Sequence, residues 1–334
     1  MANIKDVARA AGVSSSTVSR VINDSPSISN ETKAHVRHVI KTMNYTPNQN
    51  AKALTNNKSY TVTLLVDVDD EKAFQNPFFY EVMHGIEKYV YQKEYSLIVA
   101  NLNTKVKKTN VLDWLVKGKR TEGVILPSAI LDPAIVEDLR KEGVPFVSIG
   151  EPEKVRQSVS WIDIDNLKGT ERATYRFLEQ GRRQIAFIGL ESSELFSRRR
   201  HQGYISALSS YGITPDPSLV ITCANTKENG EHHMTRILEG PTTPDAVICA
   251  DNMLSFGVLK AIKDKGLRIP EDISVISFDN AQTAELSYPS VSTVDVDVFE
   301  LGYRSAKLLF DRIGNTDLAE EGILISTVIT TRET

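Results

Sequence analysis

From about residue 60 onward, the sequence alternates between short apolar runs and longer amphipathic segments. We expect strands at Val62–Val68, Leu97–Ala100, Gly123–Leu126, Phe146–Ile149, Ile185–Ile188, Ala246–Cys249 and Ile273–Phe278. Helical patterns lie between them at Phe79–Tyr91, Leu167–Leu178, Gly203–Tyr211 and Leu254–Lys265. This alternation is typical of parallel sheets that are covered by helices on both faces. These strand–helix units are too many for a single sheet, so we predict two similar α/β lobes. We expect a ligand cleft between the lobes, at the carboxyl ends of the strands.

The segment that precedes this region predicts a small helical bundle. Its first helix carries apolar residues at the spacing i, i+3, i+4 and i+7, namely Ile4, Val7, Ala8 and Ala11. Gly12 supplies a turn, and Ser14 can cap a second helix. A third helix is expected to begin near Ser29. Two short helices that are joined by a glycine turn have the spacing of a helix-turn-helix motif.

The electric charge is distributed unevenly along the chain. The whole sequence carries a net charge of -4, which by itself argues against nucleic acid as a partner. Residues 1–58, however, hold eight basic and three acidic side chains, a balance of +5, so the remainder carries -9. A basic head on an acidic body favours local attraction to phosphates, while the body is repelled from the duplex.

The outward face of the second predicted helix is rich in side chains that can form hydrogen bonds with DNA. These are Ser15, Ser16, Thr17, Ser19, Arg20 and Asn23. Arg20 can bind O6 and N7 of a guanine, and the serines can reach neighbouring base edges. The N-terminus of the helix favours a phosphate. A solvated helical face is the alternative for any one serine, so the interpretation depends on the whole set, the turn glycine and the basic charge.

Composition limits the remaining classes of function. A hydrophobic content of 41% and a charged content of 25% are ordinary for a soluble globular protein. Cys223 and Cys249 have no metal-binding spacing, and we see neither a signal peptide nor a membrane-spanning run, so we expect a cytoplasmic protein. Neither G-x-x-x-x-G-K-S/T nor G-x-G-x-x-G follows the first strand, and the histidines form no metal cluster. We therefore expect no cofactor, no metal and no catalytic site.

The head resembles the LacI/GalR family of bacterial transcription regulators. The residues that carry the likeness are Ile4–Ala8, Ala11–Ser14, Thr17–Asn23 and Tyr45–Asn48, and the likeness extends over essentially the whole chain. The resemblance implies that Ser15, Ser16 and Arg20 read bases in the major groove. It also implies that Ser14, Thr17 and Ser19 lie at the phosphates. We include Asn23, Ser29 and Asn48 in the predicted DNA-binding set.

The segment from Asn48 to Thr55 is similar to the hinge helix of that family, which orders on operator DNA. Its Leu54 matches the leucine that the family inserts into the minor groove, where an apolar wedge bends the duplex. So short a helix is unstable alone in water, so we expect it to fold only when DNA and a partner subunit stabilise it. The alternative is that Leu54 packs against the core.

The core of the same family resembles two-lobed periplasmic sugar-binding proteins of type I. The likeness implies that Asn76, Phe78 and Phe79 face an effector, that Arg200 enters the cleft, and that Asp251 and Asp279 bind the ligand at strand ends. Aspartates and an arginine suit vicinal hydroxyl groups because they form charge-assisted hydrogen bonds. Each has a structural alternative. The phenylalanines can belong to the core, the aspartates can cap helices, and Arg200 belongs to a basic run that can be surface.

Together these features predict a dimeric repressor whose affinity for an operator falls when a small carbohydrate binds. A homodimer is expected because one small head reads only a few base pairs. The segments Asn76–Phe79 and Gly143–Pro152 are most similar to the maltose-responsive branch, so we predict maltose or a related glucoside. One alternative is a catabolite-control regulator with a phosphorylated carrier protein as corepressor. Another, from a different class, is a doubly wound sugar-acting enzyme.

We therefore predict three parts, namely a helix-turn-helix domain at residues 1–47, a hinge helix and linker at 48–59, and a two-lobed effector-binding and dimerisation domain at 60–334. The N-lobe is expected at about 60–160 plus 294–322, and the C-lobe at about 161–293 plus 323–334. Where many relatives carry an aspartate after the fourth strand, this chain has Gly150 and Glu151, so that contact is not transferred.

Overall fold

The computed structural model describes residues 2–45, 58–66, 77–102 and 111–334. By their contacts the residues form two compact units, Met1–Tyr60 and Thr61–Thr334. Three of the residues singled out above, Asn48, Leu54 and Asn76, lie outside the described residues. Within the described part of the chain, no helix is long and apolar enough to cross a membrane.

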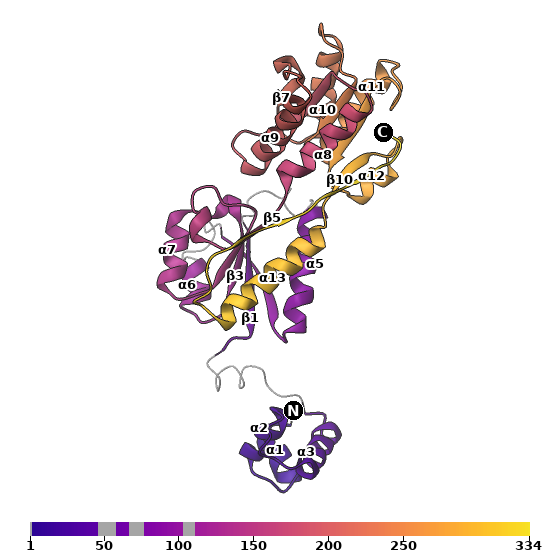
Figure 1. Ribbon diagram of the computed structural model, residues 1–334. Coiled ribbons are helices and arrows are strands. Elements are labelled where there is room, and N and C mark those ends of the chain that lie inside the picture. Colours follow the sequence, from indigo (N-terminus) through magenta and orange to yellow (C-terminus); the bar gives the residue numbers. More distant parts are fainter. Residues whose placement is uncertain (1, 46–57, 67–76, 103–110) are drawn as a thin grey trace. The chain divides into compact units, whose positions relative to one another are not determined.

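The first unit is a bundle of three helices, α1 (Ile4–Ala10), α2 (Ser15–Ile22) and α3 (Asn30–Thr42) (Figure 1). Each helix begins at a polar cap, namely Asn3, Ser14 or Ser29, whose side chain accepts a backbone N–H of the first turn. Gly12 turns the chain between α1 and α2 with a φ of +64°. The shared core consists of Val7, Ala8, Ala11, Val18, Val21 and Val36. The predicted helix-turn-helix is confirmed.

The second unit contains two six-stranded sheets. The first sheet is parallel throughout, in the order β11 (Gly322–Ile325), β5 (Trp161–Ile164), β4 (Phe146–Ile149), β3 (Val124–Pro127), β1 (Thr61–Val66) and β2 (Ser96–Asn101). The second sheet runs β12 (Val328–Thr330), β10 (Ser292–Asp295), β9 (Ser274–Phe278), β8 (Ala246–Cys249), β6 (Ile185–Leu190) and β7 (Val220–Thr222). Only its edge strand β12 pairs antiparallel. The predicted pair of parallel α/β lobes is confirmed.

Helices cover both faces of the first sheet. One core cluster joins the sheet to α5 (Pro77–Gln92) and α13 (Val298–Gly314), and another joins it to α6 (Val111–Val116) and α7 (Pro133–Lys141) (Figure 1). The second lobe contains α8 (Asn166–Glu179), α9 (Leu195–Ser210), α10 (Lys227–Leu238), α11 (Asn252–Asp264) and α12 (Gln282–Leu286). Its central strands β6, β8 and β9 are nearly continuous apolar runs because both faces of a doubly wound sheet are buried there.

The expected lobe boundaries need small corrections. Strand β5, which we placed in the C-lobe, pairs with β4 and β11 of the first sheet. The end of β10 at Val294 and Asp295 belongs to the second sheet instead of the first, and most of β11 belongs to the first sheet instead of the second. The chain therefore passes between the lobes just after β5, β10 and β11.

Helices α5 and α13 approach closely because each presents a glycine to the other. A Cβ atom on Gly302 would lie 2.1 Å from the carbonyl oxygen of Val82, and one on Gly85 would lie 2.1 Å from that of Phe299. No side chain fits at such a distance, so the backbones meet directly. The same arrangement recurs where Gly230 of α10 meets α11.

We expect Gly302→Ala to lower the free energy of unfolding of the core by about 2 kcal/mol or more, because the added methyl group forces α5 and α13 apart. Gly314→Ala is the matched control in the same helix, since nothing lies within 4 Å of its added Cβ. Alanine is also a better helix former than glycine, so the control should be neutral or slightly stabilising. Urea unfolding of both variants measures the difference, and equal effects would contradict the packing argument.

Candidate DNA-binding head and effector pocket

The N-terminus of α2 carries a group of hydroxyls. The Oγ of Ser14 accepts the backbone N–H of Thr17 at 3.1 Å and lies 2.7 Å from the Oγ of Ser16 and 2.9 Å from the Oγ1 of Thr17. The first backbone N–H groups of a helix lack partners within the helix and carry the positive end of its dipole. Hydroxyls and N–H groups at this end of α2 together form a surface that can hold a phosphate.

The remaining polar residues of α2 face outward. Arg20 is exposed, and its side chain forms no hydrogen bond or ion pair with any described residue. Ser15 and Ser19 are partly exposed, and Asn23 is exposed at the C-terminal cap. Val18 and Val21 occupy the opposite face and are buried. Helix α2 therefore presents a polar face that does not pack against the core of the head.

The α2–α3 connection is held by ion pairs as well as by the packing of Ile28 against the core of the head. Asp24 adopts a φ of 51° and contacts the Nζ of Lys33 at 3.1 Å and the Nη2 of Arg37 at 2.6 Å. The hydrogen bond from Lys33 and the charges of both cations lower the pKa of Asp24. Ser29 follows as the N-cap of α3, where its Oγ accepts the N–H of Thr32 at 3.2 Å. The predicted DNA contact Ser29 thus has a structural role as well.

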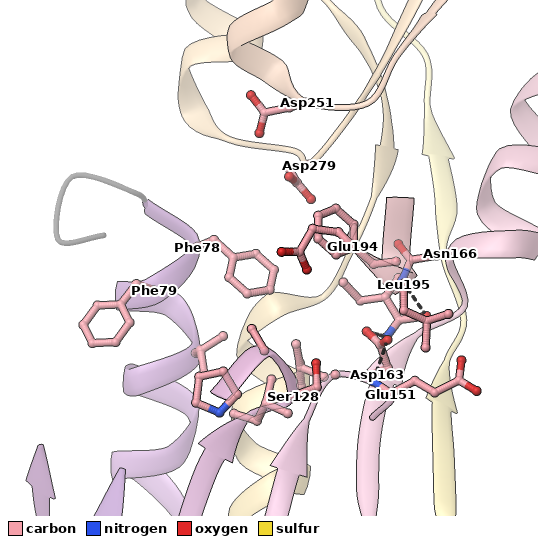
Figure 2. A pocket seen from close by; sticks show the side chains of 18 of the residues that line it. Phe78, Phe79, Ser128, Glu151, Asp163, Asn166, Glu194, Leu195, Asp251 and Asp279 are labelled. Atoms are coloured by element: carbon pink, nitrogen blue, oxygen red, sulfur yellow. Dashed lines mark hydrogen bonds between the residues drawn. The ribbon is translucent and has the colours of Figure 1, made fainter. Parts of the chain in front are cut away.

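A cavity of about 630 Å³ opens at the carboxyl ends of the strands of both sheets. Its polar lining comes from Asp163 of β5, from residues that follow β3, β4, β7, β8 and β9, and from the starts of α8 and α9, namely Ser128, Glu151, Asn166, Glu194, Asn225, Asp251 and Asp279. Its aromatic lining is Phe78, Phe79 and Phe196. In Figure 2, Phe78 points toward Glu194 and Asp279, whereas Phe79 lies on the side away from them. The cavity volume is in the range of small-molecule sites.

Arg200 is the buried cation of this cavity. Only 5% of the residue is exposed, so it is not part of a solvated basic run. Its Nε donates to the Oδ1 of Asn166 at 2.8 Å, and its Nη1 donates to the carbonyl oxygen of Ala250. The guanidinium carbon lies 3.7 Å from the centroid of the Phe278 ring. These contacts hold the guanidinium against residues of the second lobe, where it lines the cavity.

Three aspartates surround this arginine. Asp163 accepts the backbone N–H groups of Glu151 at 3.0 Å and Ile164 at 2.7 Å. Asp251 caps α11 by accepting the N–H of Met253 at 2.7 Å, as its structural alternative predicted. The Oδ1 of Asp279 is buried and has no hydrogen-bond partner among the described residues. Burial raises the pKa of all three carboxyl groups, and that of Asp251 to about 6.

Ionisation of Asp251 therefore lowers the stability of the fold at neutral pH. A carboxyl group whose pKa is raised in the native state stabilises the fold fully below its unfolded pKa, and this contribution is lost as the pH rises through the folded value. For Asp251 the loss is complete above a pH of about 6.

We expect Asp251→Asn to raise the free energy of unfolding by about 2 kcal/mol at pH 7.5, with the gain shrinking as the pH falls from 6 toward 4. Asparagine keeps the Oδ1 that accepts the N–H of Met253, so the cap of α11 is retained. Urea unfolding at pH 7.5 and pH 4.5 measures both values. A gain that does not depend on pH would show that desolvation of the charge is not the cause.

Glu151, which was not among the predicted contacts, joins the two lobes. The carboxylate is nearly buried and contacts the Nε of Arg156 at 2.5 Å. It also accepts hydrogen bonds from the Nη2 of Arg199 at 3.0 Å and the Nε of the same residue at 3.2 Å. Arg198 adds an ion pair with Glu153 at 2.7 Å. Figure 2 shows the side chain of Glu151 turned away from Asp251 and Asp279.

The structure brings together five of the six predicted effector residues. Phe78, Phe79, Arg200, Asp251 and Asp279 all line the cavity, and Asn76 lies outside the described residues. Phe78 and Phe79 also pack against the core of the first lobe, so they line the cavity and belong to the core at the same time. Six further polar residues of the lining were not among the predicted contacts, namely Ser128, Glu151, Asp163, Asn166, Glu194 and Asn225. Asp163, Asp165 and Asn166 follow one another closely where β5 passes into α8, and these polar residues next to a strand were the available signal.

Comparison with known proteins matches both parts of the chain. Residues 3–48 match the model of the bacterial regulatory proteins of the lacI family, and residues 174–334 match that of the periplasmic binding protein-like domain. Over 328 residues the chain is 32% identical to the HTH-type transcriptional regulator CelR of Thermobifida fusca, covering 98% of this chain and 96% of CelR.

Two solved structures are similar over the full length. A complex of the transcriptional regulator CelR with cellobiose has 30% identity and a TM-score of 0.75, covering 100% of this chain and 99% of that chain. The lac repressor dimer bound to its operator and the anti-inducer ONPF has a TM-score of 0.82 at 23% identity, covering 100% and 98%, and this likeness concerns the fold. The chain therefore belongs to the LacI family of bacterial transcriptional regulators.

Proposed function

We propose that the chain is a homodimeric repressor that releases its operator when maltose or a related glucoside occupies the core cavity. The observation that carries this proposal is the buried Arg200 with Asp163, Asp251 and Asp279 around it, at the carboxyl ends of the strands. Ionised carboxylates accept strong hydrogen bonds from vicinal hydroxyls, and Phe78 or Phe196 can cover the apolar face of a sugar ring. Cellobiose, present in the complex with CelR, is itself a glucose disaccharide.

For the head, we propose that Ser15, Ser16 and Arg20 read bases and that Ser14, Thr17 and Ser19 contact phosphates. The proposal is supported by the polar face of α2, which makes few contacts within the head. Asn23 and Ser29 flank this face at a helix C-terminus and a helix N-terminus. The roles of Asn48, Leu54 and Asn76 rest on the sequence resemblance alone.

The test is operator binding measured by fluorescence anisotropy, with an operator selected in vitro from a randomised pseudo-palindrome. We expect specific binding that weakens at least about tenfold with one glucoside from a panel that includes maltose and cellobiose, equivalent to about 1.4 kcal/mol. Measurement at two salt concentrations separates specific from non-specific binding. Adding a phosphorylated carrier protein tests the alternative, since stronger binding with the carrier and no response to sugar would contradict the proposal.

A further inference from the structure

The cavity carries more negative than positive charge among its described lining residues. Its carboxylates are Glu151, Asp163, Glu194, Asp251 and Asp279, and its one lining cation is Arg200. Glu151 is already balanced from outside the lining by Arg156 and Arg199. Four carboxylates and one guanidinium are left to face a ligand. Where one of these carboxyl groups takes up a proton, the cavity becomes less negative but gains no cation.

The arginine itself is largely occupied by the protein. Its Nε and Nη1 donate to Asn166 and Ala250, and its guanidinium lies over the rings of Phe278 at 3.7 Å and Phe196 at 5.2 Å. A guanidinium recognises a phosphate through two parallel N–H donors. Two of the five N–H donors of Arg200 are already engaged, so only the remaining hydrogens of Nη1 and Nη2 are left for such a contact.

Helix N-termini are the other anion-binding positions that such a fold offers, and three of those near the cavity carry a carboxylate at the cap. Asp165 is the N-cap of α8, Glu194 that of α9, and Asp251 that of α11. Helices α8 and α9 contribute residues to the cavity, and at α11 the N-cap Asp251 itself lines it. The partial positive charge at each of these ends therefore already has an anion next to it, which an incoming phosphate would meet at close range.

In the residues that the structure describes, two buried side-chain oxygens of the cavity also lack hydrogen-bond donors. The Oδ1 of Asp279 and the Oδ1 of Asn225 are buried and lack hydrogen-bond partners among the described residues. Both residues line the cavity. Hydroxyl or ammonium groups supply the missing donors, whereas a phosphate or a carboxylate would place further acceptors beside them. No group of three or more His, Cys, Asp or Glu in the described part of the chain is arranged to hold a metal ion instead.

We propose that this cavity excludes anions, so that its effector is an uncharged or positively charged sugar and not a phosphorylated sugar or a sugar acid. The inference deepens the proposed function and rests on it, because it names the ligand class of the same cavity. A regulator with such a cavity reports the free sugar, and it stops responding once a kinase-type reaction has added a phosphate.

Isothermal titration calorimetry on the full-length protein tests the inference with matched pairs. The probes are maltose against maltose 6′-phosphate, cellobiose against cellobiose 6′-phosphate, and glucose against glucosamine and glucose 6-phosphate. We expect each phosphorylated sugar to bind at least about a hundredfold more weakly than its neutral partner, because each nearby like charge costs more than a tenfold change. A phosphorylated sugar that binds within tenfold of its partner overturns the inference and leaves the proposed function standing. Absence of binding by every sugar overturns both.

Variants of the carboxylates separate exclusion by the cavity from the overall charge of the protein. Asp279→Asn and Asp251→Asn each remove one charge from the lining, and each should narrow the affinity ratio between the paired sugars by about tenfold. Asp311→Asn, on the exposed surface of α13, changes the net charge equally and should leave the ratio unchanged. Thermal unfolding checks that each variant folds. If one of the two cavity variants does not fold, the other still tests the inference. An equal change in the control, or none at either cavity position, overturns the inference.

Discussion

Replacing Arg200 by alanine is expected to abolish the response of operator binding to sugar and to lower the free energy of unfolding of the core by about 3 kcal/mol or more. The side chain is 5% exposed and donates hydrogen bonds to Asn166 and Ala250. Its removal leaves Asp163, Asp251 and Asp279 without their shared positive charge. Urea unfolding and calorimetry with the effector sugar measure the two losses separately.

Arg198→Ala is the matched control for this variant, because it removes the same kind of side chain from the same helix. Arg198 forms an ion pair with Glu153, whose side chain is 62% exposed. Exposed ion pairs contribute less than about 1 kcal/mol to the free energy of unfolding. We expect the control to bind sugar nearly as tightly as the unchanged protein. Normal sugar binding by Arg200→Ala would remove the arginine from the effector site and contradict the assignment.

The second large effect concerns the head. We expect Arg20→Ala to weaken specific operator binding by about tenfold to a hundredfold, since one bidentate contact to a guanine is worth about 1–3 kcal/mol. The fold of the head should not change, because Arg20 is exposed and has no partner among the described residues. Anisotropy with the operator and with a scrambled duplex measures specific and non-specific binding in turn.

Lys41→Ala removes one exposed positive charge from α3 and serves as the control for Arg20→Ala. A loss of general phosphate attraction weakens binding to every sequence alike, whereas loss of a base contact weakens mainly the operator. We therefore expect the ratio of operator to scrambled affinity to fall for Arg20→Ala and to stay constant for Lys41→Ala. Equal behaviour of the two variants would contradict base reading by Arg20.

Much of the fold was predictable because its signals are local. The helix-turn-helix follows from apolar spacing and a turn at Gly12, and the two lobes follow from apolar runs that alternate with amphipathic segments. Helix α9 was predicted to begin at Gly203 but begins at Leu195. Its first turns carry Arg198, Arg199 and Arg200, which are held by ion pairs and hydrogen bonds, so no apolar period marks them.

The candidate site was predictable where a polar residue directly ends a long buried strand. Asp251 and Asp279 follow β8 and β9 in this way. Asn225 follows the three-residue strand β7, and Ser128 lies in a short helical turn after β3, so neither position has a distinctive pattern. The contact between Glu151 and Arg199 joins two residues 48 positions apart in different lobes. Only the tertiary fold brings such pairs together.

The central claim is that occupancy of the core cavity and operator binding by the head are coupled. Thermodynamic linkage requires that sugar and operator change each other's affinity by the same factor. The direct measurement is therefore the dissociation constant of the effector sugar, by calorimetry, for the free protein and for its operator complex. We predict that the operator weakens sugar binding at least about tenfold, by the same factor by which sugar weakens operator binding. Equal sugar affinity with and without operator would contradict the account.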